Sequence, residues 1–194
     1  MEKRKNIEKP SLELLRGELE RTKYQQEYRR TLLNTVSVLI VVAALAVLVA
    51  MVWLPVLEIY GSSMNPTLVE GDYVVSISAK NPDRGELVAY YFGNKLLVKR
   101  VIGLPGEMID INEEGIVSVD GKPLDEPYLV EHALGECDIE LPLEVPQEQY
   151  FVLGDRRSTS LDSRNKAMGF IGQDQLVGKV VFRIWPLGRI GQVG

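Results

Sequence analysis

The sequence predicts an all-β domain with a smaller inserted β subdomain, preceded by one transmembrane helix and a helical N-terminal segment. Residues 31–57 form an uncharged, largely apolar segment, longer than the roughly 20 residues that span a bilayer as a helix. Short runs of Val, Ile, Tyr and Leu follow, separated by turns containing Gly, Asp, Asn and Pro. Because no long helical pattern interrupts these runs, a twisted sandwich or partly open barrel is expected after residue 57.

The N-terminal segment, residues 1–30, is expected to be helical. It carries nine Lys or Arg and six Asp or Glu, a net charge of +3. Leu12, Leu15 and Leu19 recur at near-helical spacing, and Ser11 can cap such a helix at its start. The pattern is typical of a solvated helix or a weak self-association helix, so we assign it no chemistry.

The predicted anchor, residues 31–57, has features of both membrane interfaces. Trp53 lies near its far end, as interfacial aromatic residues do, and Arg29 and Arg30 lie directly before its start. The positive-inside rule then places the N-terminus in the cytoplasm and the following domain outside the membrane. A cleaved signal peptide is the alternative, but the long polar N-terminus and the length of the apolar segment favour an uncleaved anchor.

The main β domain is expected to combine residues 58–106 and 149–194. Residues 107–148 are acidic, contain several Pro and Gly, and are expected to form the inserted β subdomain. Turns are predicted at residues 81–85 and at Asp120-Gly121. The predicted strands cover residues 73–77, 87–92, 95–102, 116–119, 150–153 and 176–185.

Charge and composition narrow the function classes. Residues 31–194 carry thirteen Lys or Arg and 21 Asp or Glu, a net charge of −8. Nucleic-acid binding needs a basic face, so no nucleic-acid partner is expected. The single cysteine, Cys137, cannot form an internal disulfide. No cofactor and no metal site is predicted.

Ser63 lies six residues beyond the predicted span, in a small uncharged turn. A serine hydroxyl is a weak nucleophile at neutral pH and needs a positioned base. The single histidine, His132, is expected to be a surface-loop residue, which leaves lysine as the more plausible base. Six extended residues reach about 20 Å at most, so Ser63 is tied close to the outer membrane surface.

Lys99 interrupts an apolar run and shares strand parity with Leu97 and Val101. If that face is buried, desolvation lowers the lysine pKa from its ordinary value of about 10.4, and Arg100 points outward. An ordinary turn serine and a strand lysine with a solvated amine are the alternatives that these residues alone leave open.

Four segments in order resemble the sequence boxes of the bacterial type I (leader) signal peptidases. Residues 61–68 (GSSMNPTL) are similar to the nucleophile box, and residues 71–75 (GDYVV) to the strand box after it. Residues 99–107 (KRVIGLPGE) resemble the lysine box, and residues 154–164 (GDRRSTSLDSR) resemble the last box. One box is weak evidence, but four in the family's order behind an N-terminal anchor make the resemblance specific.

The resemblance implies a role for five residues. Ser63 corresponds to the nucleophile and Lys99 to the general base. Ser160 corresponds to the serine that hydrogen-bonds the lysine amine. Asp162 and Arg164 correspond to the ion pair that holds the shape of the site, and their shared parity lets them face one partner surface.

At two positions the residue differs from one that is found in members of the family. Arg156 stands where members usually have asparagine, and an additional cation there either lowers the Lys99 pKa further or points to solvent. Gly61 stands where some members carry a serine whose hydroxyl helps to hold the oxyanion. The oxyanion hole is therefore expected to rest on backbone N–H groups of Gly61, Ser62 and Ser63.

The resemblance implies a membrane-anchored serine endopeptidase that removes signal peptides from translocated preproteins. Its implied substrates carry small residues, as Ala-x-Ala, before the cut, and its partners are these preproteins and the lipid bilayer. Met64 and Pro66 are candidate pocket residues. The alternatives are a non-catalytic, membrane-anchored protease-like scaffold, a tethered β domain that binds a partner through residues 1–30, and a self-cleaving serine–lysine protease. The last class lacks an outward-facing anchor.

Overall fold

The structure is a computed structural model that describes residues 12–53 and 55–193. The chain divides into two compact units, Met1–Ala50 and Met51–Gly194, and each is described by itself. The predicted helix cap, Ser11, lies outside the described residues.

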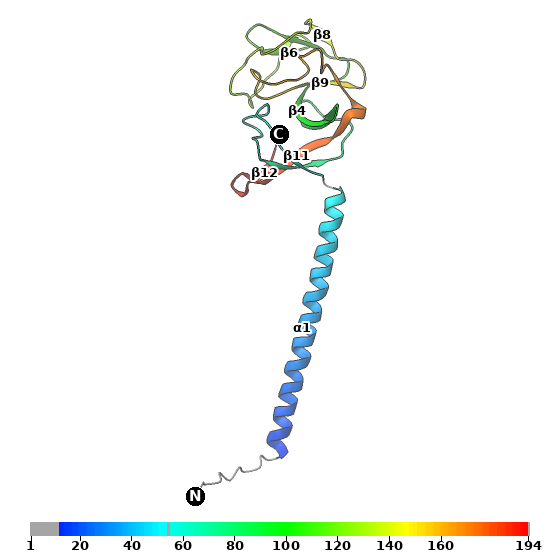
Figure 1. The fold of residues 1–194 in the computed structure, drawn as a ribbon, viewed down its shortest axis with the longest axis vertical. Helices are drawn as coiled ribbons and strands as arrows, with labels where there is room; N and C mark the ends of the chain where they lie inside the picture. Colours follow the sequence, from blue (N-terminus) through cyan, green and yellow to red (C-terminus); the bar gives the residue numbers. More distant parts are fainter. Residues whose placement is uncertain (1–11, 54, 194) are drawn as a thin grey trace. The chain divides into compact units, whose positions relative to one another are not determined.

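The first unit consists of one long helix, α1 (Leu12–Trp53), which continues a few residues into the second (Figure 1). The predicted N-terminal helix and the predicted span are therefore parts of a single helix. The helical part of the span ends at Trp53 rather than at Leu57, because Pro55 disfavours helix in the residue before it and has no backbone N–H. Val56 and Leu57 belong instead to the first strand.

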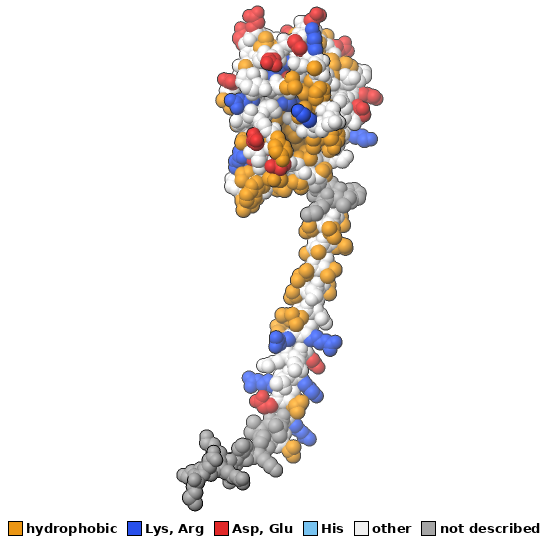
Figure 2. All heavy atoms as spheres, viewed as in Figure 1, with side chains coloured by type: hydrophobic (Ala, Val, Ile, Leu, Met, Phe, Trp, Pro, Cys, Tyr) orange, Lys and Arg blue, Asp and Glu red, His pale blue; other side chains and the backbone are white. Residues whose placement is uncertain are grey.

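Helix α1 exposes a long apolar surface. Its apolar side chains between Leu32 and Val49 are largely exposed, and Leu39, Ile40 and Val41 each show more than 60% of their surface. Figure 2 shows Lys and Arg side chains gathered on the N-terminal part of the helix and apolar ones along the rest. The helix is long and apolar enough to cross a membrane by its length and composition.

The second unit is built on an eight-stranded sheet, with strand order β1-β2-β11-β3-β4-β9-β10 and β12 paired to β11. The chain pairs its strands antiparallel throughout. Its strands are β1 (Val56–Glu58), β2 (Tyr73–Ile77), β3 (Leu87–Phe92), β4 (Lys95–Gly103), β9 (Gln149–Leu153), β10 (Ile171–Gly172), β11 (Leu176–Trp185) and β12 (Gly191–Gln192). The strands predicted for this sheet are confirmed to within one residue.

A second, four-stranded sheet lies within residues 107–148, in the order β7-β6-β5-β8. Its strands are β5 (Met108–Ile111), β6 (Val117–Val119), β7 (Lys122–Pro123) and β8 (Leu143–Glu144), and two short 3₁₀ helices, Gln173–Gln175 and Leu187–Arg189, complete the secondary structure. Ile109 and Val117 of this sheet pack in one cluster with Ile102, Phe151 and Leu153 of the main sheet. The two sheets thus share a core, and the boundary of the inserted subdomain stays a prediction.

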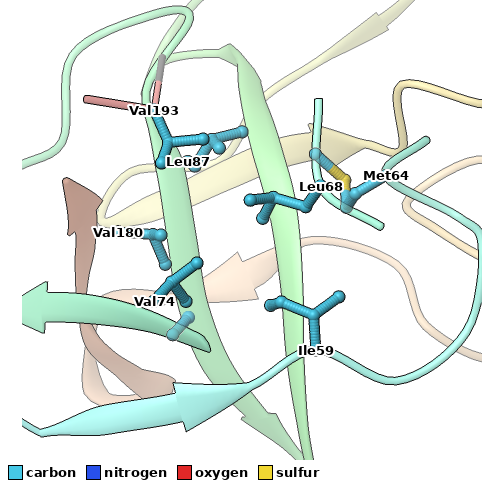
Figure 3. Close-up of a cluster of buried hydrophobic side chains, with 8 residues drawn as sticks. Ile59, Met64, Leu68, Val74, Leu87, Val180 and Val193 are labelled. Atoms are coloured by element: carbon cyan, nitrogen blue, oxygen red, sulfur yellow. The ribbon is translucent and has the colours of Figure 1, made fainter. Parts of the chain in front are cut away.

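Strand β3 is buried on both faces, and this organises the core around the sheet. Leu87 and Ala89 pack in the cluster drawn in Figure 3, with Ile59, Met64, Leu68, Val74, Val180 and Val193. Val88 and Tyr90 point to the other face and pack with Val101, Tyr150, Val152, Met168 and Ile171. A strand covered on both sides reads as a continuous apolar run rather than an alternating one.

The parity argument for β4 is half right. Lys99 is buried, and its parity partners Leu97 and Val101 pack in the cluster around Val88 and Tyr90. The prediction that Arg100 points outward is wrong, because Arg100 is only 2% exposed. Strand β4 lies between β3 and β9, and both of its faces are covered at this point, so the alternate side chain is buried too.

Candidate active site

Ser63 is held in the turn that connects β1 to β2, which we call the nucleophile turn (residues 59–68). Hydrogen bonds of 2.9 Å from Ile59 N–H to the Asp72 carbonyl and from Gly71 N–H to the Ile59 carbonyl close its base. Ile59, Met64 and Leu68 anchor the turn in the core. Gly61 has a φ of +80°, a left-handed conformation that favours glycine.

Lys99 enters the site from β4 and is 3% exposed. Its Nζ donates a hydrogen bond of 2.9 Å to Oγ of Ser160, which is also buried. Among the described residues no hydrogen bond joins the Ser63 hydroxyl to the Lys99 amine. Catalytic hydrogen bonds are often long in an enzyme without substrate and tighten in the complex.

Burial in this apolar site lowers the pKa of Lys99 to about 8, against 10.5 for a free lysine. The Asp162 carboxylate acts in the opposite direction and raises this pKa, whereas the Arg164 guanidinium lowers it. Desolvation wins because a buried ammonium loses its hydration and the nearby ion pair is close to neutral. A substantial fraction of the Lys99 amine is therefore unprotonated near pH 8.

The segment that holds Ser160, here called the site loop (residues 154–164), is ordered by a buried ion pair. Arg164 donates two hydrogen bonds of 2.8 Å to the Asp162 carboxylate, from Nε and from a terminal nitrogen. The same carboxylate accepts a 3.0 Å hydrogen bond from Gly154 N–H. Asp162 and Arg164 thus form the ion pair that the resemblance implies, and both also bond to the backbone of the loop rather than to a separate partner surface.

A second buried pair, which sequence reasoning missed, connects the lysine strand to the site loop and the nucleophile turn. Arg100 donates to both Asp155 carboxylate oxygens, at 2.9 and 2.7 Å. The Thr67 hydroxyl donates a hydrogen bond of 2.5 Å to the same carboxylate. The Tyr128 ring covers the Arg100 guanidinium at 3.9 Å. One carboxylate thus joins three of the four sequence boxes.

A third buried pair, also missed, connects the site loop to residues 107–148. Arg157 forms a bidentate ion pair with Glu126. It also donates a hydrogen bond of 3.1 Å to the Gly154 carbonyl. Arg164 extends the connection with a 2.5 Å hydrogen bond to the Leu134 carbonyl. Glu126 and Arg157 lie 31 positions apart, and the only sequence signal was an arginine pair, Arg156 and Arg157, in the last box.

The nucleophile turn and the site loop meet directly through their backbones. The Arg156 N–H donates a hydrogen bond of 3.0 Å to the Ser63 carbonyl. The Arg156 side chain itself is exposed. Gly154 lies next to this contact. A Cβ at this position would lie 2.6 Å from the Ser63 carbonyl oxygen and would overlap the Ser160 side chain. Only glycine at this position lets the two segments approach.

Ser63 and Lys99 line two cavities, whose linings also share Gly61, Lys95 and Leu97. The first, the slot cavity, measures about 610 Å³ and lies between the edge of β1 and the start of β4, from Lys95 to Lys99. The second, the hairpin cavity, measures about 500 Å³ and is lined by Phe92, Asn94 and Lys95 of the β3–β4 hairpin and by Thr159 and Leu161 of the site loop. A peptide across Ser63 could therefore place one half in each.

The remaining predicted positions are distributed unevenly. Gly61 lines both cavities, Ser62 lines the hairpin cavity, and Met64 is a core residue whose side chain reaches the slot cavity. Pro66 is exposed and lines neither cavity, and His132 is exposed on a loop. In residues 12–53 and 55–193, no group of three His, Cys, Asp or Glu side chains is placed to hold a metal ion.

Comparison with known proteins shows that the chain is similar to signal peptidases. A family model described as "Signal peptidase, peptidase S26" matches residues 32–185. The chain is 38% identical over 151 residues to signal peptidase IB of Staphylococcus aureus strain COL, covering 68% of this chain and 78% of that protein. It is 37% identical over 142 residues to a protein named probable signal peptidase I-2 of Synechocystis, covering 67% of this chain and 62% of that protein. The match thus spans less than two thirds of the cyanobacterial relative's length.

A solved structure is also similar, that of a signal peptidase I from Enterococcus faecalis V583. It is 30% identical, with a TM-score of 0.45, and the match covers 53% of this chain and 98% of that one.

Proposed function

The chain belongs to the type I signal peptidase family, a family of serine endopeptidases, and on that premise we propose that it removes signal peptides from translocated preproteins with Ser63 as nucleophile and Lys99 as general base. The observation that most supports the pairing is the environment of Lys99. Its amine is buried, is bonded to Ser160 and lines the same cavities as Ser63.

The reaction proceeds through an ester. Ser63 Oγ attacks the scissile carbonyl carbon while its proton passes to the neutral Lys99 amine. The ammonium then protonates the leaving amine as the peptide bond breaks, which regenerates neutral Lys99. Lys99 next takes a proton from water, whose oxygen attacks the ester carbonyl. The proton returns to Ser63 Oγ when the signal peptide is released as a carboxylate.

Ser160 acts as a positioning residue. A lysine amine on a flexible stem has several rotamers, and the 2.9 Å hydrogen bond to Ser160 selects one of them. The buried Asp162–Arg164 pair keeps the segment that carries Ser160 in place. The negative charge of the tetrahedral intermediate is stabilised by backbone N–H groups, including that of Ser63, and Gly61 lets the turn adopt the required conformation.

Substrate choice follows from the slot cavity. An extended peptide lies between the edges of β1 and β4 and forms main-chain hydrogen bonds with them. Ile59, Met64, Leu97 and Val98 give the cavity an apolar lining. Shallow apolar depressions that accept alanine account for the Ala-x-Ala pattern expected before the cut.

Helix α1 anchors the enzyme in the bilayer as a single span. Its exposed apolar side chains need a nonaqueous environment, and no charged residue interrupts residues 31–57. Arg29 and Arg30 favour a cytoplasmic N-terminus and an extracytoplasmic β domain, with the lipid bilayer and preproteins as partners and no nucleic acid. External protease treatment of intact spheroplasts should digest the β domain and protect an N-terminal epitope tag; the reverse pattern contradicts this orientation.

The catalytic assignment is tested by preprotein cleavage with Ser63→Ala and Lys99→Ala in the full-length protein. Each change should abolish processing while the protein stays folded and membrane-inserted. Ser158→Ala and Lys122→Ala are matched controls, because both side chains are exposed and line neither cavity. Processing at the normal rate by the Ser63 or Lys99 variant contradicts the proposal.

A further inference from the structure

The hairpin cavity offers a second binding surface beside Ser63, and its use depends on the proposed function. Ser63 and Lys99 line both cavities, so both are within reach of a peptide that Ser63 attacks. The question is which half of the substrate enters the hairpin cavity.

The slot cavity suits the half that stays attached to the enzyme. Strand β1 is the end strand of the main sheet, and β4 pairs with β3 from Lys95 onward, whereas its pairing with β9 begins only at Arg100. Two strand edges therefore face the slot and can hold an extended chain by main-chain hydrogen bonds. Such binding keeps the acyl half in place through both chemical steps.

The hairpin cavity lies on the side where the leaving amine must collect its proton. Thr159 and Leu161 line it and flank Ser160, the residue that holds the Lys99 amine. The ammonium formed on Lys99 must reach the departing nitrogen, so the leaving half lies close to this amine and its Ser160 partner. The slot cavity, by contrast, is lined by β1, β4 and the nucleophile turn, with no residue of the site loop.

The lining charge of the hairpin cavity is positive. Lys95 contributes a solvent-exposed cation, and none of the described residues that line this cavity is acidic. The slot cavity also contains Lys95 but balances it with Glu58. Phe92 and the half-exposed Leu161 add an apolar floor next to the cation. An acidic side chain with a short aliphatic part fits a cavity that combines a cation with apolar side chains.

We propose that the hairpin cavity binds the first two residues of the mature chain and that Lys95 gives the enzyme a preference for an acidic side chain there. Successive side chains of an extended peptide point to opposite sides, so one of the two positions faces Lys95. The interaction lies at a solvated rim, where an ion pair changes an equilibrium by about twofold to fivefold.

The test uses full-length enzyme in detergent micelles and synthetic peptides that end in Ala-x-Ala before the scissile bond. Asp and the isosteric Asn are compared at the first and, separately, at the second position after the bond. At one of these positions the wild-type kcat/KM should favour Asp by about twofold to fivefold at low ionic strength. The preference should shrink at high salt, because exposed charges are screened.

Three variants locate the effect. Lys95→Glu should invert the preference, and Asn94→Asp should weaken it, since Asn94 lines the hairpin cavity and not the slot. Lys122→Glu produces the same change in net charge on an exposed strand outside both cavities and should leave the preference unchanged.

Equal cleavage of the Asp and Asn peptides by wild type overturns the inference, as does an equal loss of preference in the Lys95 and Lys122 variants. A charge preference confined to positions before the scissile bond also overturns it. Failure of the wild-type enzyme to cleave any of the peptides instead counts against the proposed function, so the two results are distinguishable.

Discussion

The nucleophile turn and the site loop hold the two sides of one active site by different means. The nucleophile turn is fixed by backbone hydrogen bonds and by apolar anchors such as Met64 and Leu68. The site loop is fixed by buried charges, with Asp155, Arg157 and the Asp162–Arg164 pair each less than 3% exposed. Ser160, which holds the Lys99 amine, therefore lies in a segment fixed by buried ion pairs, whereas the nucleophile lies in a turn fixed by apolar packing. Substitutions in the two regions should differ accordingly.

Breaking the ion pair between the site loop and residues 107–148 should have the largest effect. Arg157→Met leaves the Glu126 carboxylate buried without its partner, which costs about 3–5 kcal/mol of unfolding free energy. Chemical unfolding of the full-length protein in micelles measures it. Arg84→Met is the control, because its pair with Glu107 is partly exposed and is worth at most about 1 kcal/mol. Equal costs for the two changes would remove the distinction between buried and surface charges in this domain.

Gly154→Ala should reduce kcat/KM by about a hundredfold, or about 2.7 kcal/mol, because its Cβ forces apart the Ser63 carbonyl and Ser160. The expected misplacement of the reacting groups is sufficient for a loss of this size. Gly188→Ala provides the control, since a Cβ there meets no atom within 4 Å and its φ is not positive. Full activity of the Gly154 variant would mean that the contact between the two segments does not position the dyad.

Replacing Lys99 should stabilise the protein while abolishing activity. Because the folded-state pKa of Lys99 is about 8 and the unfolded value is 10.5, the unfolded chain binds more protons between these pH values. Wild-type stability should thus rise as the pH increases from about 8 to 10.5. Lys99→Met should be about 3 kcal/mol more stable than wild type near pH 7, with the difference lost above pH 10.5.

Thermal melting as a function of pH measures this difference. Lys95→Met is the comparison, because Lys95 is exposed on the same strand and its replacement removes no buried ammonium. A Lys99 variant that is less stable than wild type at every pH contradicts a strongly desolvated amine.

Gly61→Ala should have a smaller effect, of about 1–2 kcal/mol in stability. A Cβ at Gly61 meets no atom within 4 Å, so the cost comes only from the positive φ. Thermal melting measures this loss of stability. A loss of kcat/KM for Gly61→Ala that is larger than the loss for Gly154→Ala would reverse the ranking of the two segments.

Arg156→Asn, which restores the residue that the family usually carries, should have the smallest effect. The Arg156 side chain is exposed, and only its backbone N–H contacts Ser63. The expected change is below about 0.5 kcal/mol in stability and below twofold in kcat/KM. A large change would indicate that this side chain acts on Lys99 through its charge.

The sequence was sufficient for features with a local pattern. The strands at residues 73–77 and 87–92 follow from short apolar runs between turns. The ordered boxes predict roles for Ser63, Lys99 and Ser160, and the structure joins Lys99 to Ser160 by a hydrogen bond. The sequence was insufficient for the pairs that depend on distant segments. Glu126 meets Arg157 only because the two sheets share a core, and no local pattern encodes that pairing.

Arg100 illustrates the limit of parity reasoning. Alternation along a strand predicts an exposed residue only when one face of the sheet is open to solvent. Here the Tyr128 ring and the Asp155 carboxylate cover the second face, so both Lys99 and its neighbour are buried. The face of β4 that carries Arg100 is therefore more polar than the face that carries Lys99.

The central claim, that a neutral lysine activates Ser63, is tested most directly by the pH dependence of kcat/KM. The account predicts a rise with pH that is half-maximal near pH 8, set by Lys99 and unchanged in His132→Ala. A rise that is half-maximal near pH 6.5, the ordinary range of an imidazole, and that is lost in His132→Ala would contradict it.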